Sequence, residues 1–271
     1  MVETDLQPAN LFRAGKLTEA IAAATAAVKQ APMDLGRRVL LAELLLFSGN
    51  LERADVILDA ASQVDPSALT VVAEFRQLLR AETARRQLYR DGRVPEFLGE
   101  PEPVERAALA AFVAWRAGDL AGAKTLADEA EALRPRAPGT SGGIAFDDFR
   151  DADDMLPGFI ETLTTTGKYY WIPLSRIESM EFHPPKRPRD LVWRRCSMSV
   201  SSGPDGDVYI PVTYFAEPDT TDDAHRLGRA TSWSDEVGGP VRGSGQRIFL
   251  VGDEAAGIMD LGSIEFSQTS A

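Results

Sequence analysis

The stretch FDDFRDADDMLPGFIE, residues 146–161, lies between two halves of the chain whose sequence patterns differ. The residues before it repeat with a helical period, and those after it are typical of short strands joined by Gly and Pro turns. Within the stretch, Asp147, Asp151 and Asp154 are spaced to share one face of a helix. Pro157 would end or kink that helix, because an interior proline loses a backbone hydrogen bond. We therefore predict a helix here, followed by a short second helix containing Phe159, Ile160 and Leu163.

Five aspartates fall within the eight residues 147–154, which raises the question of a metal site. An EF-hand loop needs a glycine at its sixth position, and no glycine stands at that spacing here. Two other interpretations remain open. Either the aspartates form a solvated acidic face near a helix N-terminus, or they form a carboxylate cluster that pairs with arginines from the second half. We expect neither a metal site nor a bound cofactor.

The composition is that of an ordinary soluble globular protein. The chain has 271 residues, of which 44% are hydrophobic and 26% charged, enough for one large or two ordinary domains. Cys196 is the only cysteine, so no internal disulfide can form and a reducing compartment fits. The start MVETDLQPAN has no basic region and no apolar run, and no segment has the apolar length of a membrane span. We therefore expect a cytoplasmic protein without a signal peptide.

The net charge of −12 is concentrated in the second half of the chain. Residues 1–140 hold 20 acidic and 17 basic residues, a difference of −3, and residues 141–271 hold 21 and 12, a difference of −9. A surface of this sign repels phosphate backbones, so nucleic acid is not an expected partner.

Three segments of the first half repeat one another: LFRAGKLTEAIAAATAAVKQAP, LLFSGNLERADVILDAASQVDP and FVAWRAGDLAGAKTLADEAEALRP. Their glycines (Gly15, Gly49, Gly118) and closing prolines (Pro32, Pro66, Pro135) are separated by 34 and then 69 residues. A period of 34 is that of the tetratricopeptide repeat, in which the glycine turns the chain between two antiparallel helices. A fourth unit is degenerate, because Thr83 stands at the glycine position. Residues 71–92 are better described as one long helix, and VPEFLGEPEP after it as a surface loop.

Stacked helical repeats form a curved solenoid whose concave side commonly binds a helix or an extended peptide. The repeat register favours seven residues for the groove side, although any one such residue is more often ordinary core between helices. These candidate groove residues are Phe12, Arg13, Val39, Phe47, Phe112, Trp115 and Arg116.

The second half predicts a mainly antiparallel sheet. Strands are expected in KYYWIPL, in residues 177–182, in RIFLVGD and in SIEF. RRCSMSV and DVYIPVTYF are expected to form a hairpin across Gly203–Gly206. The prolines of HPPKRPRD make that segment a loop, and a turn of helix is expected near residues 190–193.

No recognisable catalytic motif is present in the second half. There is no G-x-S-x-G, no H-E-x-x-H and no phosphate loop, and two histidines with one cysteine lack zinc-ligand spacing. Cys196 is expected in the core. The arginines of this half favour either an internal polar network with the aspartates or a recognition surface. The residues proposed for the network are Asp151, Asp153, Asp154, Arg189, Arg229, Arg242 and Arg247.

Six phrases occur in order: DDFRDADDMLPGFIETL, GKYYWIPLSRI, PRDLVWRR, VYIPVTY, RLGRATSW and VRGSGQRIFL. Together they resemble the ImpE family, also called SciE-type or TagJ proteins, which are accessory proteins of bacterial type VI secretion systems. The resemblance implies a non-enzymatic protein. For the TagJ branch it implies binding to the N-terminal helix of the small sheath subunit TssB and a link to the unfoldase ClpV.

The sequence therefore predicts an α+β protein with helical repeats over residues 1–140 and a strand-rich domain over residues 141–271. We expect an adaptor of type VI secretion that binds protein partners and neither nucleic acid nor membrane. The alternative is a small-molecule-binding or enzymatic role for the second domain, using Asp151, Asp153 and Asp154 with nearby Arg and Trp. A scaffold that acts by self-association is a third possibility.

Overall fold

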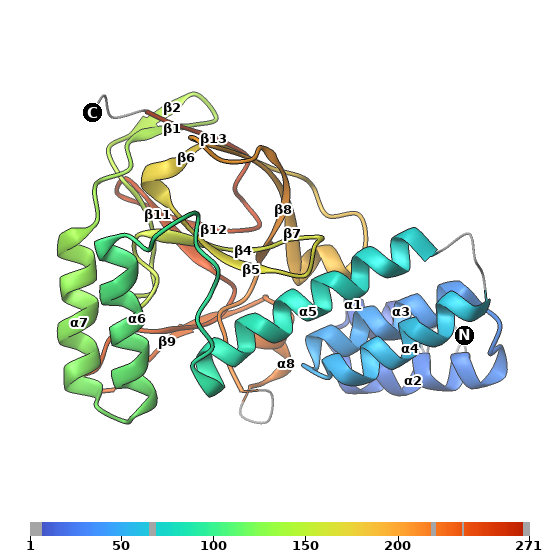
Figure 1. Cartoon of the computed structure of the whole chain (residues 1–271). Helices are drawn as coiled ribbons and strands as arrows, with labels where there is room; N and C mark the ends of the chain where they lie inside the picture. Colours follow the sequence, from blue (N-terminus) through green and yellow to red (C-terminus); the bar gives the residue numbers. More distant parts are fainter. Residues whose placement is uncertain (1–6, 65–68, 218–220, 235, 268–271) are drawn as a thin grey trace.

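A computed structural model describes residues 7–64, 69–217, 221–234 and 236–267. Its helical half consists of the helices α1 Pro8–Arg13, α2 Leu17–Gln30, α3 Leu35–Phe47, α4 Leu51–Val64, α5 Leu69–Asp91, α6 Pro103–Arg116 and α7 Leu120–Leu133. The helices α1 to α4 lie together, α6 and α7 form a separate pair, and α5 runs between the two groups beside the strands (Figure 1). The predicted helical-repeat region is confirmed.

The repeat glycines stand where the sequence pattern predicts turns. Gly15, Gly49 and Gly118 have φ angles of 79°, 74° and 80°, and each lies between two consecutive helices. Glycine adopts this left-handed conformation without the steric penalty of a Cβ. At the degenerate fourth position Thr83 is helical and its hydroxyl donates to the Leu79 carbonyl, so α5 continues unbroken as predicted. Pro66, the second of the closing prolines, lies outside the described residues.

The predicted helices within residues 146–163 are wrong. The segment forms the strand β3 Phe149–Asp151, a run of turns, and the strand β4 Phe159–Leu163. Asp151 accepts a hydrogen bond from the Asp153 amide, and Asp153 accepts one from the Met155 amide, both at 2.9 Å. Aspartates that bind backbone two residues ahead favour turns over helix. The spacing that suggested a helical face therefore belongs to successive turns.

The main sheet has eight strands in the order β2-β1-β13-β6-β7-β8-β4-β5. Its other strands are β1 Gly139–Ser141, β2 Ile144–Phe146, β5 Tyr169–Pro173, β6 Ile177–Phe182, β7 Trp193–Val200, β8 Gly206–Pro211 and β13 Ser263–Phe266. All pairings between these strands are antiparallel, including the predicted hairpin of β7 and β8. A short 3-10 turn, η3 Pro188–Leu191, precedes β7.

Two smaller sheets complete the strand-rich half. The strands β11 Ile248–Val251 and β12 Glu254–Gly257 pair with β3, and β9 Thr231–Trp233 pairs with β10 Gly243–Gly245. A single helical turn, α8 Asp223–Arg226, precedes β9. The structure thus confirms an α+β fold with helices first and an antiparallel sheet second.

The Pro-rich segment after α5 is more than the predicted surface loop. Glu96 pairs in parallel with Tyr170, and its amide and carbonyl bond to Tyr169 and Trp171 at 2.9 and 3.1 Å. The Phe97 ring packs edge-on against Trp171 with 6.2 Å between ring centroids. This segment therefore covers the outer edge of β5, an edge that would otherwise be open to another strand.

One hydrophobic core connects the two halves. It begins at Leu11 in α1 and includes Trp171, Trp193 and Tyr209 from the sheet. The Phe159 ring stacks on Trp171 with centroids 3.9 Å apart, and Phe112 of α6 packs on the same indole at 5.7 Å. The sheet encloses a second cluster of its own, which contains Phe149, Cys196 and Phe249. The helices thus share a core with the sheet, across the predicted boundary at residue 140.

Candidate functional site

Two of the acidic residues from the opening stretch lie deep inside the protein. Asp151 and Asp153 are 1% and 0% exposed. The Asp151 carboxylate accepts hydrogen bonds from Arg247 Nη1 at 2.8 Å and from the Tyr214 hydroxyl at 2.8 Å. Asp153 Oδ2 accepts one from the Gly243 amide at 2.9 Å. Each oxygen of these two carboxylates therefore has a donor, and Asp151 pairs with Arg247 inside the protein.

Glu161, which sequence reasoning missed, occupies the centre of this network. It lies in β4 and is 0% exposed. Its Oε1 accepts hydrogen bonds from the Tyr169 hydroxyl at 2.5 Å, Arg85 Nε at 3.1 Å and the Tyr89 hydroxyl at 3.2 Å. Its Oε2 accepts one from Arg247. A lone carboxylate in the apolar run FIETL was the signal that could have identified it, because buried carboxylates are nearly always paired.

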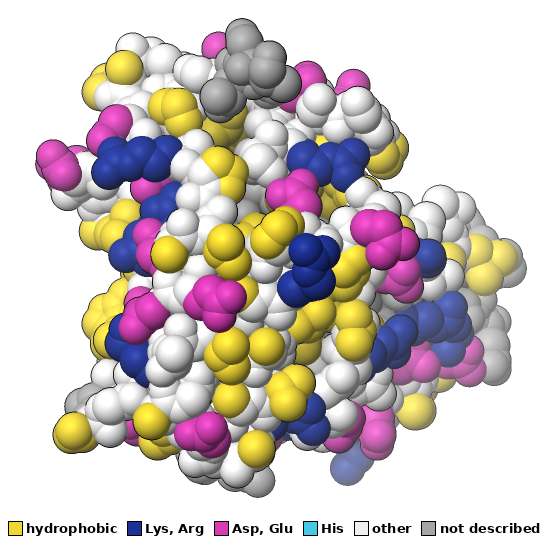
Figure 2. Space-filling model, turned by 60° about the vertical axis from the view of Figure 1, so that its left-hand side comes forward, with side chains coloured by type: hydrophobic (Ala, Val, Ile, Leu, Met, Phe, Trp, Pro, Cys, Tyr) yellow, Lys and Arg dark blue, Asp and Glu magenta, His cyan; other side chains and the backbone are white. Residues whose placement is uncertain are grey.

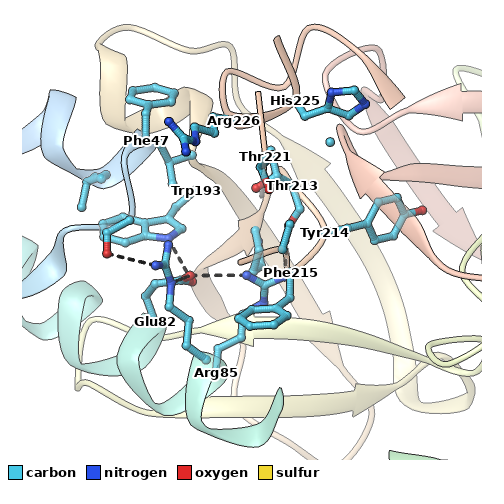
Figure 3. Close-up of a pocket in the computed structure, with 17 residues that line it drawn as sticks. Phe47, Glu82, Arg85, Trp193, Thr213, Tyr214, Phe215, Thr221, His225 and Arg226 are labelled. Carbon is cyan, nitrogen blue, oxygen red and sulfur yellow. Dashed lines mark hydrogen bonds and ion pairs between the residues drawn. The ribbon is translucent and has the colours of Figure 1, made fainter. Parts of the chain in front are cut away.

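The network crosses from the sheet to α5 in the helical half. Arg85 of α5 bonds to Glu161 and also donates to the Thr213 carbonyl at 3.0 Å. Glu82, one turn earlier, accepts from Arg86 Nε at 2.8 Å and from Trp193 Nε1 at 3.4 Å. Figure 3 shows Glu82, Arg85 and Trp193 meeting where α5 faces the strands. We call the set Glu82, Arg85, Asp151, Glu161 and Arg247 the seam network.

Electrostatics within the seam network follow burial and ion pairing. Burial would raise the pKa of Glu161, but Arg85 and Arg247 outweigh it and lower that pKa to about 2. Burial raises the pKa of Asp151 to about 7, and Arg247 opposes the rise. Arg247 keeps a raised pKa through Asp151 and Glu161 despite its complete burial. Such a network holds elements together, because removing one partner leaves a buried charge uncompensated.

The cavity beside the seam network is small. About 60 Å³ is open between Glu82, Arg85, Trp193, Phe215 and His225 (Figure 3). Ligand pockets usually measure about 300–1,000 Å³, so this space accommodates a few water molecules rather than an organic substrate. Asp151 and Asp153 do not line it, and they therefore do not converge on an open pocket with arginines.

The remaining residues proposed for the network make further contacts, and Arg242 Nε also lies 3.9 Å from Asp153 Oδ2. Asp154 accepts from the Val241 amide at 2.8 Å, and Arg242 lies over the Trp115 ring, 4.2 Å from its centroid. Arg189 donates to Glu74 at 3.2 Å and lies 4.8 Å from the Phe75 centroid. Arg229 donates to the Phe12 carbonyl at 2.9 Å and so caps the end of α1. The arginines of the second half thus fasten the strands to the helices at several separate points.

The seven candidate groove residues do not form one open groove. Phe12, Phe47 and Phe112 are buried, Val39 and Trp115 are half-buried, and Arg13 and Arg116 are exposed. Phe12 and Phe47 pack on each other with centroids 5.0 Å apart, whereas Phe112 packs on Trp171 of the sheet. Trp171 and Arg242 of the strand-rich half pack against Phe112 and Trp115, so the seven side chains do not line one concave surface. Phe12 and Arg13 line one open groove, which is described below.

The cysteine, the histidine–serine contact and the possible metal ligands of the described residues do not have the geometry of known catalytic or metal sites. Burial raises the pKa of Cys196 to about 12, which keeps the thiol protonated. His183 Nε2 lies 2.8 Å from Ser197 Oγ, but that hydroxyl donates to Asp207 at 2.7 Å. A catalytic triad instead uses one imidazole nitrogen for the serine and the other for the carboxylate. Among the residues that the structure describes, no group of three His, Cys, Asp or Glu could hold a metal ion.

No helix within residues 7–64, 69–217, 221–234 and 236–267 is long and apolar enough to cross a bilayer. On the side where α6 and α7 lie, basic and acidic side chains are interspersed with small apolar ones (Figure 2). This face carries no extended surface of a single charge.

Comparisons with known proteins agree with the geometry. The family model described as ImpE protein matches residues 143–265, and a tetratricopeptide repeat model matches residues 11–79. A Pseudomonas aeruginosa protein named type VI secretion system accessory component TagJ is 31% identical over 261 residues, which cover 96% of this chain and 91% of that protein. A crystal structure of a Vibrio parahaemolyticus protein superposes with a TM-score of 0.89 at 28% identity, covering 97% of this chain and 98% of the other.

Proposed function

From the premise that this chain belongs to the ImpE family of type VI secretion accessory proteins, we propose that it acts as a non-enzymatic, cytoplasmic adaptor. The observation that carries the proposal is the similarity to a type VI accessory component over nearly the whole length of both chains. The helical-repeat half supports a role in binding proteins, since such repeats usually present a surface to a partner segment.

The partner that we propose is the N-terminal helix of a TssB-like small sheath subunit. An isolated amphipathic helix binds through apolar side chains, and specificity comes from the polar rim around them. Through this contact the protein would be linked to ClpV-dependent disassembly of the sheath. The burial and pairing of Asp151 and Asp153 favour this adaptor over the alternative in which these carboxylates perform chemistry or bind a small molecule.

Calorimetric titration tests the proposal directly. The probe is a synthetic peptide of the first helix of the small sheath subunit encoded beside this protein, and a scrambled peptide of the same composition is the control. We expect binding in the micromolar range for the native peptide alone. Equal heats for the two peptides, or no heat for either at high micromolar concentration, would contradict the sheath-helix proposal.

A further inference from the structure

An open groove lies where α1 and α3 meet the loop before η3. Its volume is about 400 Å³, within the range of sites that bind ligands or side chains. Phe12 and Leu40 come from the helical half, and Pro185, Pro188 and Leu191 come from the strand-rich half. The other lining residues are Ala9, Arg13, Lys186 and Arg187. We call these nine residues the α1–α3 groove.

The charge of the α1–α3 groove is opposite to that of the protein. Every charged lining residue is a cation, although the chain carries a net charge of −12. Arg13 and Lys186 are exposed, whereas Arg187 is partly compensated by Asp190 at 3.4 Å. A local basic rim on an acidic protein selects for acidic groups in whatever binds there.

The α1–α3 groove is also held in shape before any partner binds. The Asp190 carboxylate accepts hydrogen bonds from the Lys186 and Arg187 amides at 2.9 and 3.2 Å, which fixes the loop. Pro185 and Pro188 restrict its backbone further. At the opposite wall, Phe12 is held by the Phe47 ring and by Arg229 at the end of α1. A preformed groove binds with a smaller loss of conformational entropy.

We propose that the α1–α3 groove receives the partner helix, with an apolar side chain inserted between Phe12, Leu40 and Leu191 and Asp or Glu residues of the helix facing Arg13 and Lys186. This inference rests on the proposed function and adds the place and the charge of the contact. Apolar lining next to a purely cationic rim matches an apolar helix face flanked by carboxylates. The exposure of both rim cations lets them meet a partner without changing the fold.

Charge reversal at the rim tests the inference. The sheath-helix peptide is titrated against the full-length protein and its Arg13→Glu/Lys186→Glu variant. We expect the dissociation constant to rise about tenfold or more, because two attractive contacts become repulsive. A Leu40→Ala variant should also bind more weakly, without a change in salt dependence. Lys168→Glu, at an exposed lysine in the turn between β4 and β5, is the control and should bind as the native protein does.

The outcomes separate the groove from the proposed function. If the native protein binds and the rim variant binds equally well, the groove assignment is overturned while the adaptor function stands. An equal loss in the Lys168→Glu control would also overturn it, because the effect would then be one of net charge. If the native protein does not bind the peptide at all, both proposals fail. Light scattering of the native protein addresses a second copy as occupant, and a dimer abolished by the rim variant would overturn the helix assignment.

Discussion

At the scale of single residues, Glu43 shows how burial makes stability depend on pH. It lies in α3 with 4% of its surface exposed. Burial raises its pKa from 4.5 to about 7, and Arg189 opposes the rise, with smaller effects from Arg187 and Asp190. Because the folded state binds the proton more tightly than the unfolded state, protonation of Glu43 stabilises the fold. That stabilisation is present below pH 4.5 and is lost as pH rises toward 7.

We predict that Glu43→Gln stabilises the protein at pH 8 by up to about 3 kcal/mol, since one pKa unit corresponds to about 1.4 kcal/mol. The difference should shrink toward zero near pH 5, where the native carboxyl is protonated in the fold. Urea unfolding at both pH values measures it, and Glu19→Gln at an exposed site of α2 serves as the control. A gain that is the same at pH 5 and pH 8 would contradict this account.

The pairing of individual charged residues was predictable only where a visible run of one charge suggested partners of the other. Asp151, Asp153, Arg242 and Arg247 were expected to pair because aspartates cluster in residues 147–154 and several arginines follow them in the second half. Glu161 was not expected to pair, because it is the single charged residue of β4 and lies outside the run of aspartates, whereas Arg85 and Arg247 reach it from 76 and 86 residues away. Nothing local to β4 or α5 specifies which distant charge will face them. These groups are buried because α5 packs on the sheet. The sequence pattern does not show that this helix and this sheet lie against each other.

At the scale of elements, periodicity predicted the helices well and the acidic stretch poorly. Repeats of 34 residues and positive φ at Gly15, Gly49 and Gly118 have one cause, a turn between antiparallel helices. The stretch 146–161 has helical spacing, yet its aspartates bind their own backbone and form turns. A helical period is therefore informative only where the side chains do not compete for backbone amides.

Two glycines with similar backbones provide a test at this scale. Gly118 and Gly245 have φ angles of 80° and 87°. A Cβ on Gly118 would meet no atom within 4 Å, whereas one on Gly245 would lie 2.0 Å from the Ala230 carbonyl oxygen. We predict that Gly118→Ala costs about 1 kcal/mol, from backbone strain alone, and that Gly245→Ala costs about 3 kcal/mol or more. Thermal unfolding compares the two, and equal losses would show that close approach at β10 is unimportant.

At the scale of the whole molecule, the helical and strand-rich halves are joined by both apolar and ionic contacts. The same hydrophobic cluster contains Leu44 of α3 and Trp193 of β7, and the seam network places Arg85 of α5 on Glu161 of β4. Repeats of the predicted kind could fold separately from a sheet, so residue 140 was a reasonable boundary from sequence. In the structure, neither half can be removed without exposing core residues and leaving buried charges unpaired.

We therefore predict that residues 1–140 and 141–271 unfold in one transition. Circular dichroism follows the helices, and tryptophan fluorescence follows mainly the strand-rich half, which holds Trp171, Trp193 and Trp233 of the four tryptophans. The two urea curves should coincide.

Glu161→Gln should shift both curves together to lower urea concentration. The expected loss of unfolding free energy is about 3–5 kcal/mol, because Arg85 and Arg247 lose their shared counter-charge. Glu265→Gln at an exposed position of β13 should change neither curve. Separate transitions for the two signals, or a Glu161→Gln shift confined to fluorescence, would instead make each half its own cooperative unit.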